Sequence, residues 1–131
     1  MMRSGKIIVI SADDSTPHSI CTSLTASGYK VIHISRGAEV IDHIRTEKPA
    51  MVVLDNELPD INSLAIVRSI RASGLTDKIP VILIGSNMKE EDALIGLEAG
   101  ADLCLLESFH PQVFAARVRS LLRRCELVKA H

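Results

Sequence analysis

The hydrophobic residues of this chain are concentrated in five short runs, separated by longer segments of mixed polarity. Isoleucine, valine and leucine dominate the runs, and apolar and polar positions do not alternate within them. Continuous apolar strands of this kind are buried on both faces, as in a parallel sheet that helices cover. The pattern therefore predicts parallel strands at residues 6–10, 29–34, 51–54, 80–84 and 102–106.

The segments between the runs have the spacing of amphipathic helices. Leu64, Val67 and Ile70, for example, share one stripe, and Gly74 follows as a C-cap. The pattern predicts helices at residues 15–28, 37–47, 63–73, 88–99 and 111–127. In the last helix we expect the arginines to face outward and one apolar stripe to face inward, formed by Val113, Phe114, Val118, Leu121 and Leu122.

Strands and helices alternate five times with short connections. This alternation predicts an α/β fold with an open, doubly wound parallel sheet and helices on both faces. In such sheets the functional site lies at the carboxyl ends of the strands. The segments expected to form it are residues 11–14, 55–60, 85–87 and 107–109.

Composition narrows the function classes. A length of 131 residues fits one domain, which we expect to span residues 1–131 with its core at about 5–126. The formal charge of -1 and the 2% of aromatic residues provide neither a basic field nor stacking surfaces for nucleic acid. No apolar run has the length of a membrane span and no signal peptide is recognisable, so we expect a cytoplasmic protein without membrane contact. The three cysteines form no C-x-x-C pair, which argues against a zinc or redox site.

Three motifs carry a resemblance to a known family. They are V-V-L-D-N-E-L-P-D at 52–60, E-A-G-A-D-L-C-L-L at 98–106, and P-Q-V-F-A-A-R-V-R-S-L-L-R-R at 111–124. In this order and spacing they resemble the response-regulator receiver domains of two-component (phosphorelay) signalling, over nearly the whole chain. The resemblance implies a flavodoxin-like sheet of five strands in the order 2-1-3-4-5 with five helices.

The resemblance also implies a chemistry. A receiver of this family accepts a phosphoryl group on an aspartate, here Asp55, while two acidic residues after the first strand help to hold a divalent cation such as Mg²⁺. A lysine after the fifth strand and a hydroxyl residue after the fourth bind the phosphoryl oxygens. The reaction depends on positioning and charge neutralisation. We expect Asp55 at the carboxyl end of the third strand, in a cleft that is open to solvent.

The acidic pair is displaced in this chain. Counting from the first strand without a gap places Ser11 and Ala12 at its two positions, while Asp13 and Asp14 follow one step too late. We therefore expect Ala12 to lie nearer to the Asp55 carboxylate than Asp14 does. A slip of one residue would return Asp13 to the site, where Asp13 and Asp55 would be the metal ligands. The alternative, which we favour, is that these acids are solvated and lie at a helix N-terminus.

The phosphate-binding positions are altered as well. Glu107 stands where the family has lysine, and a reversed charge there would repel both Asp55 and its phosphorylated form. Glu107 sharing a cation with Asp55 is an alternative. Gly85 stands at the position of the hydroxyl residue, with Ser86 next to it, and Cys104 replaces the usual aromatic residue of the switch.

These departures favour one of three interpretations. The leading one is a degenerate receiver that is not an enzyme and acts as a phosphorylation-independent protein-interaction module. The alternative is a functional receiver phosphorylated on Asp55, in which Asp13 and Ser86 rescue the pocket. A small-molecule-binding flavodoxin-like domain is the third, and no phosphate-binding glycine motif supports it.

The partners follow from the family resemblance. They would be a histidine kinase or an output protein, and we expect no nucleic acid to bind to this domain. A homodimer through the last helices is a further expectation, because the face of the fourth helix, fifth strand and fifth helix would carry charges of both signs, at Lys89, Glu90, Glu91, Arg117, Arg119 and Arg123.

Overall fold

The computed structural model describes residues 5–12, 15–74, 79–85, 88–106 and 110–130, apart from the side chains of residues 15–18, 106 and 125–130. In this part of the chain, strands and helices alternate in the predicted order. The strands are β1 (Lys6–Ile10), β2 (Lys30–Ile34), β3 (Met51–Asp55), β4 (Val81–Gly85) and β5 (Leu103–Leu106). The helices are α1 (Ser15–Ala26), α2 (Val40–Glu47) after the short 3₁₀ turn η1 (Gly37–Glu39), α3 (Ser63–Ala72), α4 (Glu90–Ala99) and α5 (Pro111–Ala130).

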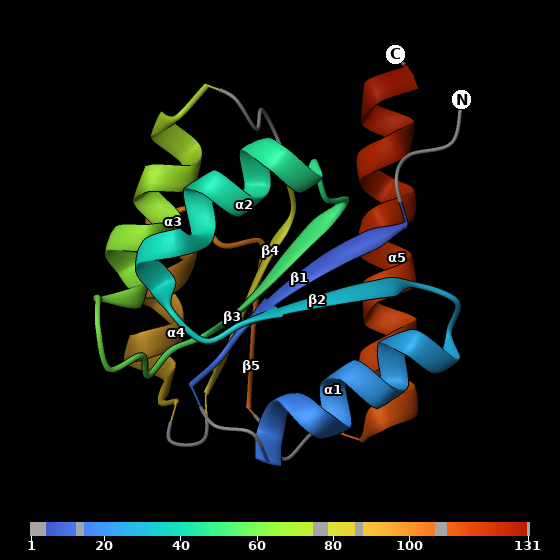
Figure 1. Cartoon of the computed structure of the whole chain (residues 1–131), viewed down its shortest axis with the longest axis horizontal. Helices are drawn as coiled ribbons and strands as arrows, with labels where there is room; N and C mark the ends of the chain where they lie inside the picture. Colours follow the sequence, from blue (N-terminus) through green and yellow to red (C-terminus); the bar gives the residue numbers. More distant parts are fainter. Residues whose placement is uncertain (1–4, 13–14, 75–78, 86–87, 107–109, 131) are drawn as a thin grey trace.

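The five strands form one parallel sheet in the order β2-β1-β3-β4-β5. The predicted doubly wound fold and strand order are therefore confirmed. In Figure 1, α1 and α5 cover one face of the sheet, and α2, α3 and α4 cover the other. The sheet lies between these two layers, which is why its central strands are apolar at successive positions.

Alternate residues of each strand supply two separate cores. Ile8 and Leu54 point toward the α2 and α3 side, where Val40, Ile44 and Ile70 pack against them. On the opposite face, the residues that meet α1 and α5 are Ile7, Val9, Met51, Val53, Ile82 and Ile84, packed against Ile20, Leu24, Phe114, Val118 and Leu121. The side-chain period of two explains how one uninterrupted apolar run serves both layers.

Several element boundaries differ from the sequence prediction, most of them by one or two residues. The fourth helix begins at Glu90 rather than at residue 88, because the Asp92 side chain accepts a hydrogen bond from Lys89 N (3.0 Å) and caps the helix there. The first turn of the second helix is a 3₁₀ turn. The last helix continues to Ala130, three residues beyond the prediction, and in Figure 1 it extends past the end of the sheet.

The expected inward orientation of Val113 is wrong. Its residue surface is 48% exposed, whereas Phe114 beside it is fully buried, so the stripe of α5 that faces the sheet begins at Phe114. Leu121 is buried and Leu122 packs at the edge of the same core. The described part of the chain contains no helix that is both long and apolar enough to cross a membrane.

Candidate functional site

Three strand ends meet around Asp55. Asp55 is the last residue of β3, and the strands on either side of it are β1, which ends one residue before Ser11, and β4, which ends at Gly85. Parallel strands place their carboxyl ends at the same edge of the sheet. The arrangement therefore brings Ser11, Asp55 and Gly85 together, although they lie far apart in the sequence.

The Asp55 side chain is buried rather than open to solvent. Only 6% of the residue is exposed, so the expectation of a solvent-open position is wrong for this side chain. Its Oδ2 accepts a hydrogen bond from the Ser11 hydroxyl (3.1 Å), and its Oδ1 accepts one from the backbone N–H of Glu57 (2.9 Å). Both carboxylate oxygens thus have donors within this chain, and those donors limit how the carboxylate can turn.

Ser11 is itself held in place from β2. The residue is fully buried, and its backbone N–H donates to the carbonyl of Ile34 (3.1 Å). The ring nitrogen Nε2 of His33 lies 2.9 Å from the Ser11 carbonyl oxygen, so this nitrogen must act as the donor. These contacts orient the Ser11 hydroxyl toward Asp55 through the backbone of the neighbouring strand.

Ser63 fixes the backbone of the acceptor residue. Its hydroxyl, which is buried, donates to the carbonyl of Asp55 (2.7 Å) from the first turn of α3. The Asn62 side chain caps this helix by accepting from Leu64 N (2.8 Å). This bond was not predicted from the sequence.

A second carboxylate ties two site loops together. Asp60 accepts from the backbone N–H groups of Gly37 (3.2 Å) and Ala38 (3.1 Å), at the start of η1. The bond from Ala38 is the main reason that the pKa of Asp60 is lowered, with smaller contributions from the Gly37 bond and from Arg36. The loop after β3 is thereby attached to the loop after β2.

Gly85 occupies a crowded position. A Cβ atom built there would lie 3.2 Å from Cβ of Asn56 and 3.3 Å from Cε of Met88. A threonine or serine at residue 85 would require these neighbours to move by a few tenths of an ångström. The structure thus gives a packing reason for glycine where the family resemblance implies a hydroxyl.

Cys104 lies half-buried on β5 beneath α4. Its thiol is within 3.6 Å of the carbonyl oxygen of Ala93, and burial raises its pKa, so it acts as a small neutral side chain. Gly96 faces it from the helix, and a Cβ at Gly96 would lie 3.1 Å from the Cys104 sulfur. The missing side chain of Gly96 thus lets α4 approach β5 closely at Cys104.

Several predicted site residues lie outside the described part of the chain. They are Asp13, Asp14, Ser86 and Glu107, so their predicted roles stay predictions. Ala12 is described and exposed, but its distance from Asp55 relative to Asp14 is likewise not tested.

The described residues do not form a cation site. They contain no group of three or more His, Cys, Asp or Glu side chains placed to hold a metal ion. Around Asp55 the described side chains provide one carboxylate and the Ser11 hydroxyl, whereas Mg²⁺ favours six oxygen ligands, commonly including one or two carboxylates. Asp13 and Asp14, the acidic candidates for further ligands, lie outside the described residues, so a Mg²⁺ site here stays a prediction.

Large apolar side chains are exposed on α4 and at the start of α5. Leu94, Ile95 and Leu97 are 57%, 45% and 46% exposed, and Val113 is 48% exposed. The inner side of α4 instead presents Gly96, which is buried against Leu83 and Cys104. The large side chains of α4 thus point outward, and exposed clusters of this kind commonly mark protein–protein contact sites.

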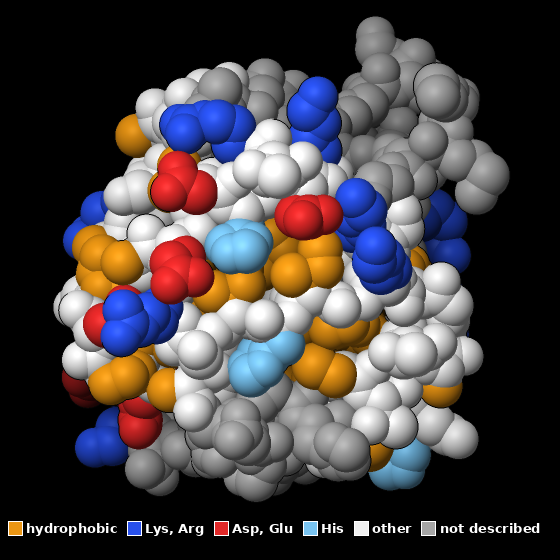
Figure 2. Space-filling view, viewed as in Figure 1, with side chains coloured by type: hydrophobic (Ala, Val, Ile, Leu, Met, Phe, Trp, Pro, Cys, Tyr) orange, Lys and Arg blue, Asp and Glu red, His pale blue; other side chains and the backbone are white. Residues whose placement is uncertain are grey.

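The charged residues of α5 are divided between its two sides. Arg117 lines a shallow hollow with Val113 and Ser120, whereas Arg119 faces α1. The sequence analysis placed Arg119 on the same face as the fourth helix. The structure places it on the α1 side of α5 instead. Elsewhere, over α2 and β2, Figure 2 shows basic and acidic side chains interspersed rather than a field of one sign.

Comparison with known proteins identifies related sequences. Residues 5–119 match the family model of the response regulator receiver domain. The chain is 34% identical over 122 residues to the alkaline phosphatase synthesis transcriptional regulatory protein PhoP of Bacillus subtilis, covering 93% of this chain and 50% of PhoP. It is 33% identical over 120 residues to the transcriptional regulatory protein AfsQ1 of Streptomyces coelicolor, covering 92% of this chain and 52% of AfsQ1. The chain thus spans about half the length of these curated relatives.

Solved structures show the same architecture. The BeF3-activated N-terminal receiver domain of Klebsiella pneumoniae RstA superimposes with a TM-score of 0.84 at 29% identity, over 90% of this chain and 98% of that one. The signal receiver domain of a LuxO repressor protein from Vibrio parahaemolyticus has a TM-score of 0.89 at 19% identity, over 98% and 97% of the two chains. The latter similarity concerns the fold alone.

Proposed function

Because this chain belongs to the response regulator receiver family of two-component signalling, we propose that it is a receiver whose surface is recognised without phosphorylation of Asp55. The observation that supports this most directly is the Ser11 hydroxyl on the Asp55 carboxylate. A hydroxyl stands where the family resemblance implies an acidic cation ligand. The acceptor carboxylate is thus held by neutral donors of its own chain.

The described surroundings of Asp55 offer little to neutralise the negative charge that phosphorylation would add. Phosphorylation of an aspartate adds negative charge, and in this family a cation and a lysine neutralise it. Around Asp55 the described groups are a hydroxyl, a backbone N–H and the glycine at residue 85. Glu107, where the family has lysine, would add a further negative charge. The proposal therefore includes no enzymatic step.

The proposed partners are proteins. We take the exposed apolar surface of Leu94, Ile95, Leu97 and Val113 as the site of contact with a second copy of this chain, and a histidine kinase or an output protein as the wider signalling partner. The cytoplasm is the proposed location. The free thiols of Cys21 and Cys104 suit its reducing conditions.

The test is phosphorylation by a small donor. The 131-residue chain is incubated with acetyl phosphate and Mg²⁺, and its intact mass is measured beside an Asp55→Asn variant and a competent receiver as positive control. We expect no added phosphoryl group on either form of this chain. Stoichiometric labelling that disappears in Asp55→Asn would instead establish the alternative function, a phosphoacceptor receiver.

A second measurement tests whether Glu107 prevents a phosphoryl group from binding beside Asp55. Beryllofluoride, a mimic of the phosphoryl group, is titrated into the wild type and into Glu107→Lys, with amide chemical shifts as the readout. We expect no binding to the wild type and weak binding to Glu107→Lys, because the lysine replaces a repulsive charge with an attractive one. Tight binding by the wild type would contradict the proposal.

A further inference from the structure

The last helix is capped by a histidine side chain. α5 begins at Pro111, and His110 just before it accepts a hydrogen bond at ring nitrogen Nδ1 from the backbone N–H of Gln112 (3.2 Å). The backbone carbonyl of His110 accepts from Phe114 N (2.9 Å), which is the first bond along the helix. His110 thus occupies the N-cap position, where a side-chain acceptor for one of the first N–H groups stabilises a helix.

We propose that His110 is a proton-sensitive cap that controls the first turn of α5. A backbone N–H can only donate, so Nδ1 carries no proton in this contact and the ring is neutral. A protonated imidazole donates from both of its nitrogens and cannot accept from Gln112. Its positive charge would also lie at the N-terminal end of a helix, which is itself partially positive. Protonation therefore removes the bond and adds a repulsion.

The other described histidines respond to a proton differently. Of the five histidines in the sequence, the structure describes the side chains of His33, His43 and His110. Nε2 of His33 donates to the carbonyl of Ser11, and a protonated ring can still donate. Nε2 of His43 lies 3.8 Å from the Glu39 carboxylate, so a proton there would create an ion pair. Among these three side chains, only His110 has a contact that requires the neutral ring.

The described residues around the cap provide no counter-charge for a protonated ring. His110 lines a shallow hollow on α5, in which Arg117 is the charged neighbour. On the other side of Pro111, the groove between α1 and α5 has Arg119 as its charged member. Neither set of lining residues contains a carboxylate, so a proton on the ring would not gain an ion pair in exchange for the lost hydrogen bond.

Carboxylates occur on neighbouring elements, but the described ones line neither the hollow nor the groove. β5, which precedes the cap, is apolar from Leu103 to Leu106. The acidic first turn of α4 does not contribute to the lining of either surface; its residues are Glu90, Glu91 and Asp92. Glu107 and the side chain of His18 lie outside the described residues, so the Glu107 charge needs a test of its own.

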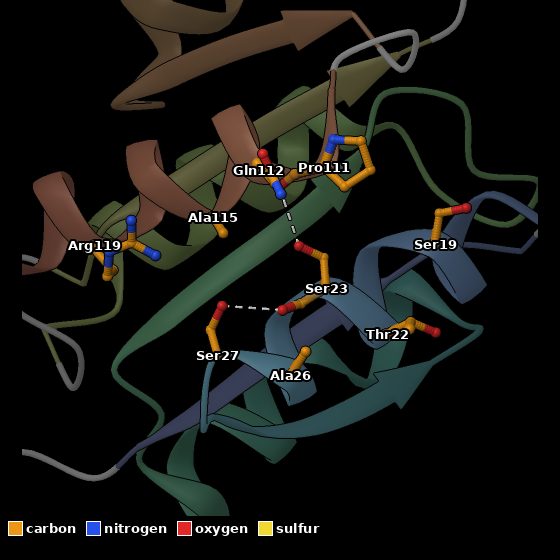
Figure 3. Close-up of a pocket in the computed structure, with 9 residues that line it drawn as sticks. All are labelled: Ser19, Thr22, Ser23, Ala26, Ser27, Pro111, Gln112, Ala115 and Arg119. Carbon is orange, nitrogen blue, oxygen red and sulfur yellow. Dashed lines mark hydrogen bonds between the residues drawn. The ribbon is translucent and has the colours of Figure 1, made fainter.

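The turn that His110 caps contacts α1 on one side and solvent on the other. The Ser23 hydroxyl of α1 donates to the carbonyl of Pro111 (3.2 Å), and Figure 3 shows this serine beside the start of α5. Val113 is 48% exposed, whereas Phe114 is fully buried in the core under α5. Release of the cap would therefore loosen residues 111–113 and leave the rest of the helix attached to the sheet.

A proton on His110 would thereby act on the surface for a second copy of this chain. Val113 belongs to that surface together with Leu94, Ile95 and Leu97, and this consequence rests on the proposed function, whereas the cap itself does not. Loosening the turn displaces Val113 and reduces the apolar area that a second copy covers. Histidine side chains commonly change charge between about pH 5 and pH 8, so we expect the response in this range.

The test compares the 131-residue chain with His110→Asn, because asparagine is a good N-cap residue without a titrating ring. The equilibrium constant of unfolding is measured in urea from about pH 8 to about pH 5. We expect the wild-type constant to rise about fivefold relative to that of His110→Asn, the usual size of a lost cap. The amide NMR signals of Gln112 and Val113 should move with the same midpoint in the wild type, and much less in the variant.

His43→Gln is the matched control, since it removes another histidine from a helix of the same chain. A proton on His43 would strengthen its contact with Glu39, so the effect has the opposite sign. The wild-type unfolding constant should therefore stay the same or fall by up to about twofold relative to His43→Gln on acidification. Glu107→Gln, combined with and without His110→Asn, tests the undescribed carboxylate, and the fivefold difference should persist in this pair.

Two results would overturn the cap. A ratio of unfolding constants between wild type and His110→Asn that does not change with pH would show that the ring is not a proton-sensitive cap. A changing ratio without movement of the Gln112 and Val113 signals would show that the proton acts elsewhere in the chain.

Sedimentation velocity at the two ends of the pH range tests the consequence for self-association. We expect acidification to weaken the association of the wild type more than that of His110→Asn, and an equal response in both would overturn the regulation. A wild type that is monomeric at the higher pH would contradict the proposed surface for a second copy, whereas urea unfolding and NMR would still test the cap. Labelling of Asp55 by acetyl phosphate is independent of all these measurements, so failure of the cap is distinguishable from failure of the proposed function.

Discussion

The Ser11 hydroxyl lies 3.1 Å from Oδ2 of Asp55, and this contact joins the end of β1 to the end of β3. Both residues are buried, and His33 and Ile34 of β2 hold the Ser11 backbone. The acceptor aspartate is consequently oriented by a neutral group. Replacing Ser11 with an acidic residue tests whether this site can bind a divalent cation.

Ser11→Asp should create a weak divalent-cation site. The new carboxylate would stand beside that of Asp55, and two like charges at this distance repel unless a cation lies between them. We expect a free energy of unfolding lower by about 1–3 kcal/mol in EDTA and largely restored by Mg²⁺. Urea unfolding with and without Mg²⁺ measures both effects.

Ser11→Asn is the control for that experiment, because it changes the side chain without adding charge. Its stability should not depend on Mg²⁺. If the wild type already shows the same Mg²⁺ dependence as Ser11→Asp, ligands outside the described residues, Asp13 above all, must supply the cation site.

Ser63→Ala should destabilise the chain by about 1–2 kcal/mol, because it leaves the buried carbonyl of Asp55 without its hydroxyl donor. Ser69→Ala, at an exposed position of the same helix, should have almost no effect. Urea denaturation of the two variants makes the comparison. Equal losses of unfolding free energy in the two variants would show that the effect comes from replacing any serine of α3, and not from the contact with Asp55.

The Asp60 contact predicts a dependence on pH. Its pKa is lowered from 3.8 in the folded state, chiefly by the bond from Ala38 N, so its stabilising contribution is complete above that value. The contribution is lost as the pH falls through the lower folded-state pKa. Asp60→Ala should therefore be less stable than the wild type at neutral pH, and the two melting temperatures should converge on acidification. If the melting temperatures of the two proteins keep the same difference down to the lowest pH measured, the Asp60 carboxylate does not stabilise the fold in this way.

The exposed surface of α4 predicts self-association. Leu94→Glu and Ile95→Glu should shift the chain toward monomer, since each places a charge within a surface that a second copy would cover. Ile61→Glu, at a 37% exposed residue of the loop after β3, is the control and should leave the sedimentation coefficient unchanged. A wild type that stays monomeric at all concentrations would argue against the homodimer.

The order of elements and the position of Asp55 could be predicted from the sequence alone. Uninterrupted runs such as Ile7–Ile10 must be covered on both faces, and this requirement leads to parallel strands with helices on each side. The end of the first strand follows from the same run, so placing Ser11 directly after it needed no tertiary information. Such patterns are local, and their physical cause is the side-chain period of the strand.

The contacts of these residues depended on tertiary structure. The bonds from Ser11 and Ser63 to Asp55 cross 44 and 8 residues of sequence, and their geometry depends on how β1, β3 and α3 pack. The outward side chains of α4 follow from Gly96, whose missing side chain lets the helix approach Leu83 and Cys104. The division of Arg117 and Arg119 between two surfaces likewise required knowing which side of α5 meets α1. Sequence periodicity identifies the buried stripe of a helix, but only packing determines which neighbour each remaining side chain meets.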